Sequence, residues 1–219
     1  MFRKILVLSI ISLFIGSIAM AEEKIINLPT PKTRSKTSIE QSIANRRSHR
    51  EFLAKDLTMD QLSQILWAAQ GITDKDFGFR AAPSAGALYP LNIYIAKKDG
   101  VFRYIADGHK LVQLSKEDKR PSLVRASLGQ TFIKEAPVDI IISANFAITQ
   151  AKYGARAFRY VCMEIGHVAE NIHLQAVSLG LGSVPIGAFW DDVIKQNLDI
   201  PDNQDPLYII PIGYVNEEA

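Results

Sequence analysis

Apolar residues recur at helical spacing behind two clear start signals in the first third of the chain. Ser38 followed three residues later by Gln41 is a capping box, and it predicts a helix up to about Arg46. The same box at Thr58, again with glutamine three residues on, opens an amphipathic helix that stops at Gly71. The sequence therefore sets the ends of two helices locally.

The longest predicted helix runs from 156 to 179 and is ended by Gly180 and Gly182. One stripe is apolar at helical spacing and comprises Phe158, Val161, Ile165, Val168, Ile172, Ala176 and Leu179. The other faces also carry apolar side chains, namely Tyr160, Met163, Ala169 and Leu174. A helix that is apolar most of the way round lies either at the centre of a fold or at a subunit interface.

Short β-rich segments complete the pattern. Residues 91–97 and 101–106 flank Asp99-Gly100, a dipeptide that favours a tight hairpin. Residues 138–143 and 207–214 are apolar runs that follow prolines, and they predict buried strands. Helices and strands mix without strict alternation, which predicts the α+β class.

Composition narrows the class of protein. The chain has 219 residues, of which 47% are hydrophobic and 22% charged, so a single folded domain is expected. Its one cysteine, Cys162, excludes an intramolecular disulfide and a multi-cysteine zinc site. Because Cys162 falls in the long apolar helix, we expect it to be a small core residue.

The first residues have the pattern of a secretory signal peptide. A basic start at Arg3 and Lys4 precedes an apolar stretch, and Ala19-Met20-Ala21 supplies small residues for cleavage after Ala21. We therefore predict a signal peptide at 1–21 and an exported, periplasmic protein with no membrane span after cleavage. An uncleaved segment would instead act as a membrane anchor.

Two further regions follow the predicted signal. The polar segment 22–37, with Pro29 and Pro31, is expected to be an extended arm, and 38–219 to be one domain. The formal net charge of +2 is carried by the signal, because the remainder has 23 basic and 23 acidic residues. A neutral domain gives no general reason to bind nucleic acid.

Arg46-Arg47-Ser48-His49-Arg50 gathers three guanidinium groups and a hydroxyl where the first helix ends. Such planar cations bind a phosphate monoester through paired hydrogen bonds. The alternative is a solvated basic patch favoured by the helix dipole. No aromatic residue interleaves with the cluster, which argues against a nucleic-acid module.

Two further segments are rich in small residues. Residues 82–90 form a run bounded by prolines ahead of a strand, and they would either approach a flat ligand closely or simply pack as a tight loop. Residues 180–189 are predicted to form a strand and a turn that are interrupted by glycines. They lack the glycine spacing of a dinucleotide-binding fold, and the chain has no P-loop.

The four histidines do not form a predicted metal site or catalytic triad. His167 and His173 lie six residues apart and so face different sides of a helix, while His49 and His109 are isolated in sequence. No metal ion and no histidine-based catalytic triad are therefore expected.

In order along the chain, these segments resemble the nitroreductase family of FMN-dependent oxidoreductases, over about 25–214. The resemblance rests on Arg-Arg-Ser-x-Arg-x-Phe at 46–52, Pro-Ser-Ala-Gly-Ala-Leu-Tyr-Pro at 83–90, Gly-Leu-Gly-Ser-Val-Pro-Ile-Gly-Ala-Phe at 180–189 and Ile-Pro-Ile-Gly-Tyr at 210–214. The second motif looks most like the SagB-type branch, whose members include thiazoline and oxazoline dehydrogenases.

The resemblance implies a nitroreductase-like α+β fold, in which helices flank a central, mostly antiparallel sheet. It also implies a homodimer with the long helix at its interface and two FMN sites lined by both subunits. Arg46, Arg47 and Ser48 would hold the phosphate and ribityl chain, and Arg50 would reach the N1 and C2 carbonyl side of the flavin. The remaining flavin contacts would come from Pro83, Ser84, Ala85, Ala87, Leu88, Pro185, Ile186, Gly187 and Ala188, with a backbone N–H near Gly187 and Ala188 facing N5.

This sequence departs from the family pattern at two places. Ala87 stands where many members have asparagine, and no basic residue follows the last strand, so phosphate binding would depend more on the three arginines.

The implied reaction is a ping-pong transfer in which the chemistry is carried by FMN. The donor would be NAD(P)H or, if the protein is exported, another reductant such as a quinol or a redox protein. The acceptor would be a nitroaromatic, a quinone or a similar molecule. Two alternatives stay open at this point: dehydrogenation of an azoline-like substrate, and a non-enzymatic flavin-binding protein.

Overall fold

The computed structural model describes residues 24–216, so the predicted signal peptide at 1–21 lies outside the described residues. The described part is built on a seven-stranded sheet in which all neighbouring strands are antiparallel. In spatial order its strands are β1 (Ile25–Asn27), β6 (Lys110–Ser115), β5 (Gly100–Ile105), β4 (Leu91–Lys97), β7 (Val138–Ala144), β9 (Asp205–Gly213) and β8 (Gly182–Ser183). A separate small hairpin comprises β2 (Ile72–Asp74) and β3 (Phe79–Arg80).

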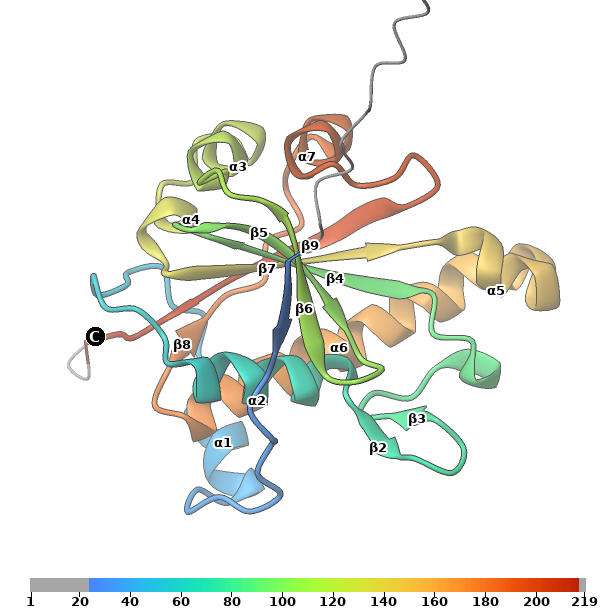
Figure 1. The fold of residues 1–219 in the computed structure, drawn as a ribbon, viewed down its shortest axis with the longest axis horizontal. Coiled ribbons are helices and arrows are strands. Elements are labelled where there is room, and N and C mark those ends of the chain that lie inside the picture. Colours follow the sequence, from blue (N-terminus) through green and yellow to red (C-terminus); the bar gives the residue numbers. More distant parts are fainter. Residues whose placement is uncertain (1–23, 217–219) are drawn as a thin grey trace, which may run out of the picture.

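Helices cover both faces of the sheet, which gives three layers (Figure 1). One face carries α1 (Ile39–Asn45), α2 (Met59–Gln70) and the long α6 (Ala157–Ser178). The other carries α3 (Arg120–Ala126), α4 (Phe132–Glu135) and α7 (Asp191–Leu198). Next to the N-terminal end of α6 lie α5 (Phe146–Tyr153) and the short 3-10 turn η2 (Gly154–Arg156), and a second 3-10 turn, η1 (Ala85–Ala87), precedes β4. The predicted α+β class and antiparallel sheet are confirmed.

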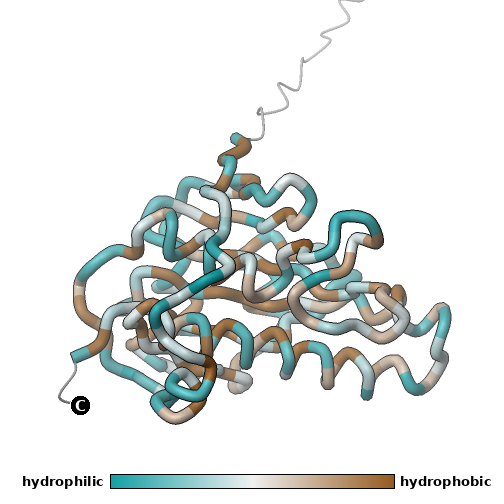
Figure 2. The backbone as a smooth tube through the Cα atoms, turned by 90° about the horizontal axis from the view of Figure 1, so that it is seen from below, coloured by the Kyte–Doolittle hydropathy of each residue, from teal (hydrophilic) through white to brown (hydrophobic). Residues whose placement is uncertain are grey.

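The central strand β7 shows why the sheet needs two helical layers. All seven of its residues are buried. Ile140 and Ile142 belong to the core that includes α2 and α6, whereas Ile141 belongs to the core with α3 and α7. A strand covered on both faces is apolar at successive positions, which is the pattern seen in the sequence. Figure 2 shows hydrophobic backbone through the interior and hydrophilic segments at many turns.

Local signals placed several elements correctly. The capping boxes at Ser38 and Thr58 are both formed, with the predicted glutamine partners, and they begin α1 and α2. The predicted β4–β5 hairpin and the β7 and β9 strands are also present.

The long helix confirms most of its predicted stripe and corrects two positions. Val161, Val168 and Ile172 are fully buried. In contrast Phe158 is 66% exposed and Cys162 is also exposed, so the prediction that Cys162 is a core residue is wrong. Phe158 lies on the same stripe as Ile172 but in the first turn of α6, where the chain's own elements leave the stripe uncovered. Cys162 lies off the stripe, on a side of the helix that the chain leaves open.

The segment before α1 runs along the surface of the sheet and of α2. β1 pairs with β6 at the sheet edge. Further on, the Gln64 amide exchanges two hydrogen bonds with the backbone of Lys32, and the Ser63 hydroxyl donates to the Pro29 carbonyl. Between residues 24 and 216, no helix is long and apolar enough to cross a membrane.

Candidate functional site

The arginine cluster lies directly after α1. Arg46 caps the helix, and its Nε lies 3.9 Å from a Glu170 carboxylate oxygen of α6. The Arg47 guanidinium donates to the carbonyls of Ala44 and Arg46, at 3.0 and 2.7 Å. No carboxylate in residues 24–216 forms an ion pair with Arg47 or Arg50, and both side chains are exposed. Their positive charge is therefore available to an anion from outside the chain.

Strand β8 holds this cluster in place. The His49 amide donates to the Ser183 carbonyl at 3.1 Å, and Ser48 and Ser183 form an isolated parallel bridge. Gly182 allows the approach, because a Cβ atom there would lie 2.9 Å from the His49 ring. Sequence segments more than 130 positions apart thus meet at one edge of the sheet.

The chain after β8 exposes its backbone next to the arginines. The side chain of Ile186 is buried, and its amide and carbonyl both bond to Ile209 of β9, so this predicted contact residue offers a ligand neither its side chain nor its backbone polar groups. Pro185, Gly187 and Ala188 are exposed. We call residues 46–50 and 183–188 together the arginine half-site.

A buried histidine braces this half-site from α6. His173 Nδ1 lies 2.6 Å from the Ser183 hydroxyl, and the ring is 4% exposed. Burial, with a smaller contribution from the charge of Arg46, lowers the pKa of His173 to about 4. The imidazole is therefore neutral at physiological pH and acts as a fixed hydrogen-bonding group between α6 and β8.

The second predicted segment, 83–89, forms a tight loop that we call the loop half-site. Three of its residues have left-handed backbone, with φ values of 64° at Gly86, 54° at Ala87 and 50° at Tyr89. Pro83, Gly86 and Ala87 are exposed, while Ser84, Ala85 and Leu88 are partly buried.

The Ser84 hydroxyl is occupied within the chain. It donates to a Glu164 carboxylate oxygen of α6 at 2.5 Å and accepts from the Tyr89 amide at 2.9 Å. A contact from Ser84 to a ligand would therefore come from its backbone.

Glu164 is a buried acid that sequence reasoning missed. Its side chain lies in α6 beneath the loop half-site and the residue is 2% exposed. Burial raises the pKa of Glu164 to about 7, although Ser84, the Arg80 charge and Gln70 act to lower it. Within the described chain its second oxygen, Oε1, has no hydrogen-bond partner. The available signal was a charged residue in the middle of the longest apolar helix.

Helix α5 contributes two further residues that the sequence did not single out. A Cβ atom on Gly86 would lie 2.7 Å from the Tyr153 hydroxyl and 2.8 Å from Lys152 Nζ. The φ of 64° favours glycine at this position, and a larger residue would also displace the ends of these two side chains. A phenol and an ammonium group thus lie next to the exposed turn of the loop half-site.

The two half-sites are separated within one chain. The loop half-site contacts α6 at Glu164, whereas the arginine half-site contacts it at Glu170 and His173. Glu164 and His173 are nine positions apart, or about 13 Å along the helix axis. In residues 24–216 no hydrogen bond, ion pair or strand pairing joins the two half-sites. One chain therefore does not assemble the predicted residues in one place.

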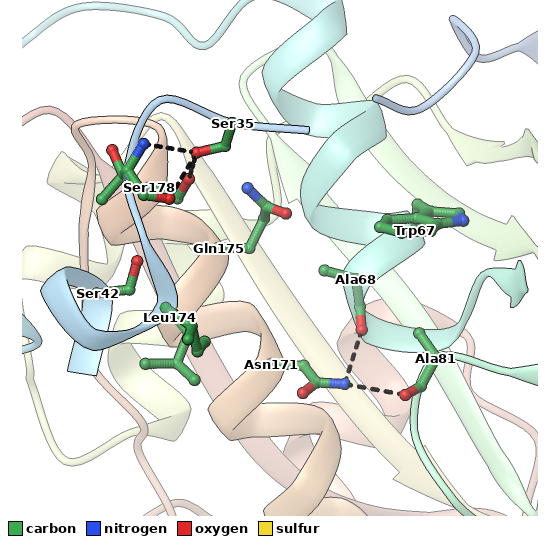
Figure 3. Close-up of a pocket in the computed structure, with 11 residues that line it drawn as sticks. Ser35, Ser42, Trp67, Ala68, Ala81, Asn171, Leu174, Gln175 and Ser178 are labelled. Atoms are coloured by element: carbon green, nitrogen blue, oxygen red, sulfur yellow. Dashed lines mark hydrogen bonds between the residues drawn. The ribbon is translucent and has the colours of Figure 1, made fainter. Parts of the chain in front are cut away.

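A surface pocket of about 320 Å³ lies between α1, α2 and α6, and Figure 3 shows its lining. The Asn171 amide at its edge donates to the carbonyls of Ala68 and Ala81, at 3.0 and 3.4 Å. None of the predicted site residues lines this pocket. No cluster of three metal-binding side chains occurs in residues 24–216.

Comparison with known proteins identifies the family. The sequence model described as "Nitroreductase family" matches residues 43–214, which include all four motifs. The chain belongs to the nitroreductase family. It is accordingly an oxidoreductase enzyme, and the alternative of a non-enzymatic flavin-binding protein is not supported.

Relatives of this nitroreductase-family chain share most of its length. A curated protein from Methanocaldococcus jannaschii, named as a nitroreductase, is 46% identical over 181 residues, which cover 80% of this chain and 90% of the relative. A crystal structure of a protein named as a nitroreductase from Ralstonia eutropha JMP134 superposes with a TM-score of 0.80 at 29% identity, covering 88% and 90% of the two chains. The NADPH:FMN oxidoreductase of Vibrio harveyi, solved with NAD+, shares the fold alone, with a TM-score of 0.62, 20% identity and coverage of 82% and 69%.

Glu164 makes the stability of this enzyme depend on pH. Because its folded pKa of about 7 exceeds the ordinary 4.5, its stabilising contribution is complete below pH 4.5 and is lost as the pH rises through 7. The loss amounts to as much as about 3 kcal/mol. Since glutamine does not ionise, Glu164→Gln should be more stable than the wild type at pH 8, and this advantage should shrink toward pH 5.

Urea unfolding at four pH values between 5 and 8 measures this difference. Glu135→Gln, on the exposed surface of α4, removes the same charge without burial and serves as control. A stability difference between Glu164→Gln and wild type that does not change with pH contradicts the assignment.

Proposed function

We propose that the enzyme is an FMN-dependent homodimer. In each site the arginine half-site of one protomer would face the loop half-site of its partner. The separation of the half-sites along α6 is the observation that carries this proposal. The first two turns of α6, with Phe158 66% and Met163 46% exposed, offer an apolar surface for the partner.

The residues of the arginine half-site fit a phosphate monoester. The guanidinium groups of Arg47 and Arg50 are exposed, and Ser48 adds an exposed hydroxyl. Planar guanidinium groups match the phosphate oxygens and stay charged at every working pH. Arg46 would contribute its charge despite the longer contact with Glu170, because that pair is largely solvated.

The remaining residues fit a flat ring system. The small side chains of Ala85 and Ala87 let the loop backbone approach closely, and the exposed backbone at Gly187 and Ala188 can donate hydrogen bonds. A guanidinium from Arg50 near the pyrimidine edge would stabilise negative charge there. When bound, FMN supplies a reversible hydride acceptor.

We further propose that donor and acceptor bind in turn at the same open face. The residues of both half-sites would hold and orient the cofactor and would not transfer protons themselves. The donor is NAD(P)H or another reductant, and the acceptor is a nitroaromatic, a quinone or a similar molecule.

A mixed dimer tests the divided site. Arg47→Ala removes a phosphate contact, and Ala85→Trp fills the space proposed for the ring, so each variant alone should retain little FMN. When the two variants are co-expressed with different tags, one of the two sites in each mixed dimer keeps both wild-type halves. Visible absorbance of the random mixture should show about one quarter of the wild-type FMN.

Lys98→Ala, in the exposed β4–β5 turn, removes a positive charge away from both half-sites and should retain full FMN. If the mixed dimers recover no FMN although each chain folds and dimerises, the site is not shared between protomers. Wild-type protein that takes up no FMN would refute the cofactor itself.

We propose that residues 1–21 direct export, on the basis of their signal-peptide pattern. NAD(P)H is essentially confined to the cytoplasm, so an exported enzyme would use a quinol or a redox protein as donor. Cell fractionation should place the full chain in the periplasm and a variant lacking residues 2–21 in the cytoplasm. Equal cytoplasmic retention of both would contradict export.

A second candidate is the SagB-type branch, with oxidation of an azoline-like ring. The motif at 83–90 supports the branch, and the positions of Tyr153 and Lys152 beside Gly86 support the chemistry. Oxidation of an azoline to an azole removes a hydride and a proton, so it needs a base beside the hydride acceptor. In its deprotonated, phenolate form the Tyr153 side chain would accept that proton.

Tyr153→Phe tests this candidate, because it keeps the ring and removes the hydroxyl. Oxidation of a thiazoline-containing peptide should fall at least about 100-fold with unchanged FMN content. Tyr160→Phe is the matched control, since its ring packs edge-on against Tyr153 at 5.1 Å. Wild-type protein that binds FMN but does not oxidise the azoline would eliminate the second candidate.

A further inference from the structure

We propose that Glu164 is a positioning residue of the FMN site, which holds the loop half-site in its binding shape through Ser84. This inference rests on the proposed function, since it assigns a purpose to a buried acid that no step of that function uses. Glu164 does not face the open side of the loop and acts only through the serine hydroxyl.

The loop half-site needs an external hold because its backbone is strained. Ala87 and Tyr89 both have left-handed φ values, as does Gly86 between Ser84 and Tyr89. For residues with a side chain this conformation costs about 1–2 kcal/mol each. Such a loop keeps its shape only where the surroundings determine it.

The Ser84 hydroxyl supplies the central part of that hold. By donating to Glu164 and accepting from the Tyr89 amide, it closes the ends of the strained stretch onto α6. The Arg80 amide donates to the Tyr89 hydroxyl at 3.1 Å, and the Arg80 guanidinium lies over the Tyr89 ring at 4.5 Å. These contacts fix Tyr89 from the other side.

Glu164 is a firm anchor because its helix is packed in the core. Its neighbours Val161, Ile165 and Val168 all belong to the main hydrophobic cluster. Removing a partner from a buried hydrogen bond to a charged group weakens the local structure substantially. Loss of the Glu164 side chain should therefore loosen the loop while leaving the helix folded.

The ionisation of Glu164 makes its restraint on the loop depend on pH. The charged group that faces the Glu164 carboxyl is the Arg80 guanidinium, and the neutral polar groups that face it are Ser84 and Gln70. Tyr89 and Tyr104 lie near Arg80 in turn. An open loop would expose the carboxyl to water and return it to its ordinary acidity. By linkage, loop opening becomes easier as the pH rises through the range in which the buried carboxyl ionises.

Amide hydrogen exchange in residues 84–90 of the full-length protein, followed by peptide mass, measures how often the loop opens and needs no cofactor. Glu164→Ala and Ser84→Ala should each speed exchange about tenfold or more. Glu164→Gln keeps an oxygen that accepts from Ser84, so at pH 6 its exchange should stay within about threefold of wild type. After correction for intrinsic rates, wild-type exchange should speed up from pH 6 to pH 8, and that of Glu164→Gln should not.

Two serine variants are matched controls. Ser183→Ala breaks the His173 brace and should speed exchange in the arginine half-site but not in 84–90. Ser143→Ala removes a buried bond to Gln204 at 2.7 Å, outside both half-sites, and should change neither segment. Should Glu164→Ala fail to fold, Ser84→Ala still carries the test.

FMN titration by fluorescence supplies the second measurement. We expect Glu164→Ala to weaken FMN binding about tenfold and Glu164→Gln to bind nearly as wild type. Unchanged exchange in both Glu164→Ala and Ser84→Ala overturns the proposal, as does faster exchange with unchanged FMN affinity. A wild type that binds no FMN refutes the proposed function, whereas the exchange contrast separately decides whether Glu164 holds the loop.

Discussion

Two buried polar side chains of α6 hold separate parts of the candidate site. Glu164 binds Ser84 at 2.5 Å and His173 binds Ser183 at 2.6 Å, and each serine belongs to a different half-site. Both groups are buried, and because nine positions make two and a half helical turns they lie on opposite flanks of the core-facing stripe of α6. The long helix is therefore the frame to which both halves are attached, and the geometry of the site depends on it.

The same helix explains why the proposed site needs a second protomer. Its inner side is occupied by the sheet, by α2 and by the two polar braces, so it cannot bring the half-sites together. The chain leaves Phe158 exposed in the first turn of α6, and Cys162 and Met163 exposed in the second. In the proposed dimer, a partner that packs on these residues would bury apolar surface and supply the other half-site in the same step.

Sequence reasoning succeeded where the determining interactions are local. A capping box involves residues three positions apart, and both Ser38 and Thr58 begin helices as expected. The family motifs likewise identified the chain's class from short runs. Prediction from sequence failed where tertiary packing determines the structure. Helices α3 and α7 have weak local sequence signals and were not predicted. The exposure of Cys162 depends on which side of α6 the rest of the chain covers.

Neither the role of Glu164 nor the separation of the half-sites could be predicted from the sequence, and the reasons are related. A glutamate in a helix is usually solvated, and only the packed structure shows this one beneath Ser84. The motifs likewise identify the two segments of the site but not the distance between them, because that distance depends on the rise of α6. Nine positions separate the two braces by about 13 Å along the helix axis, and in the proposed dimer each half-site would therefore pair with the complementary half-site of the partner.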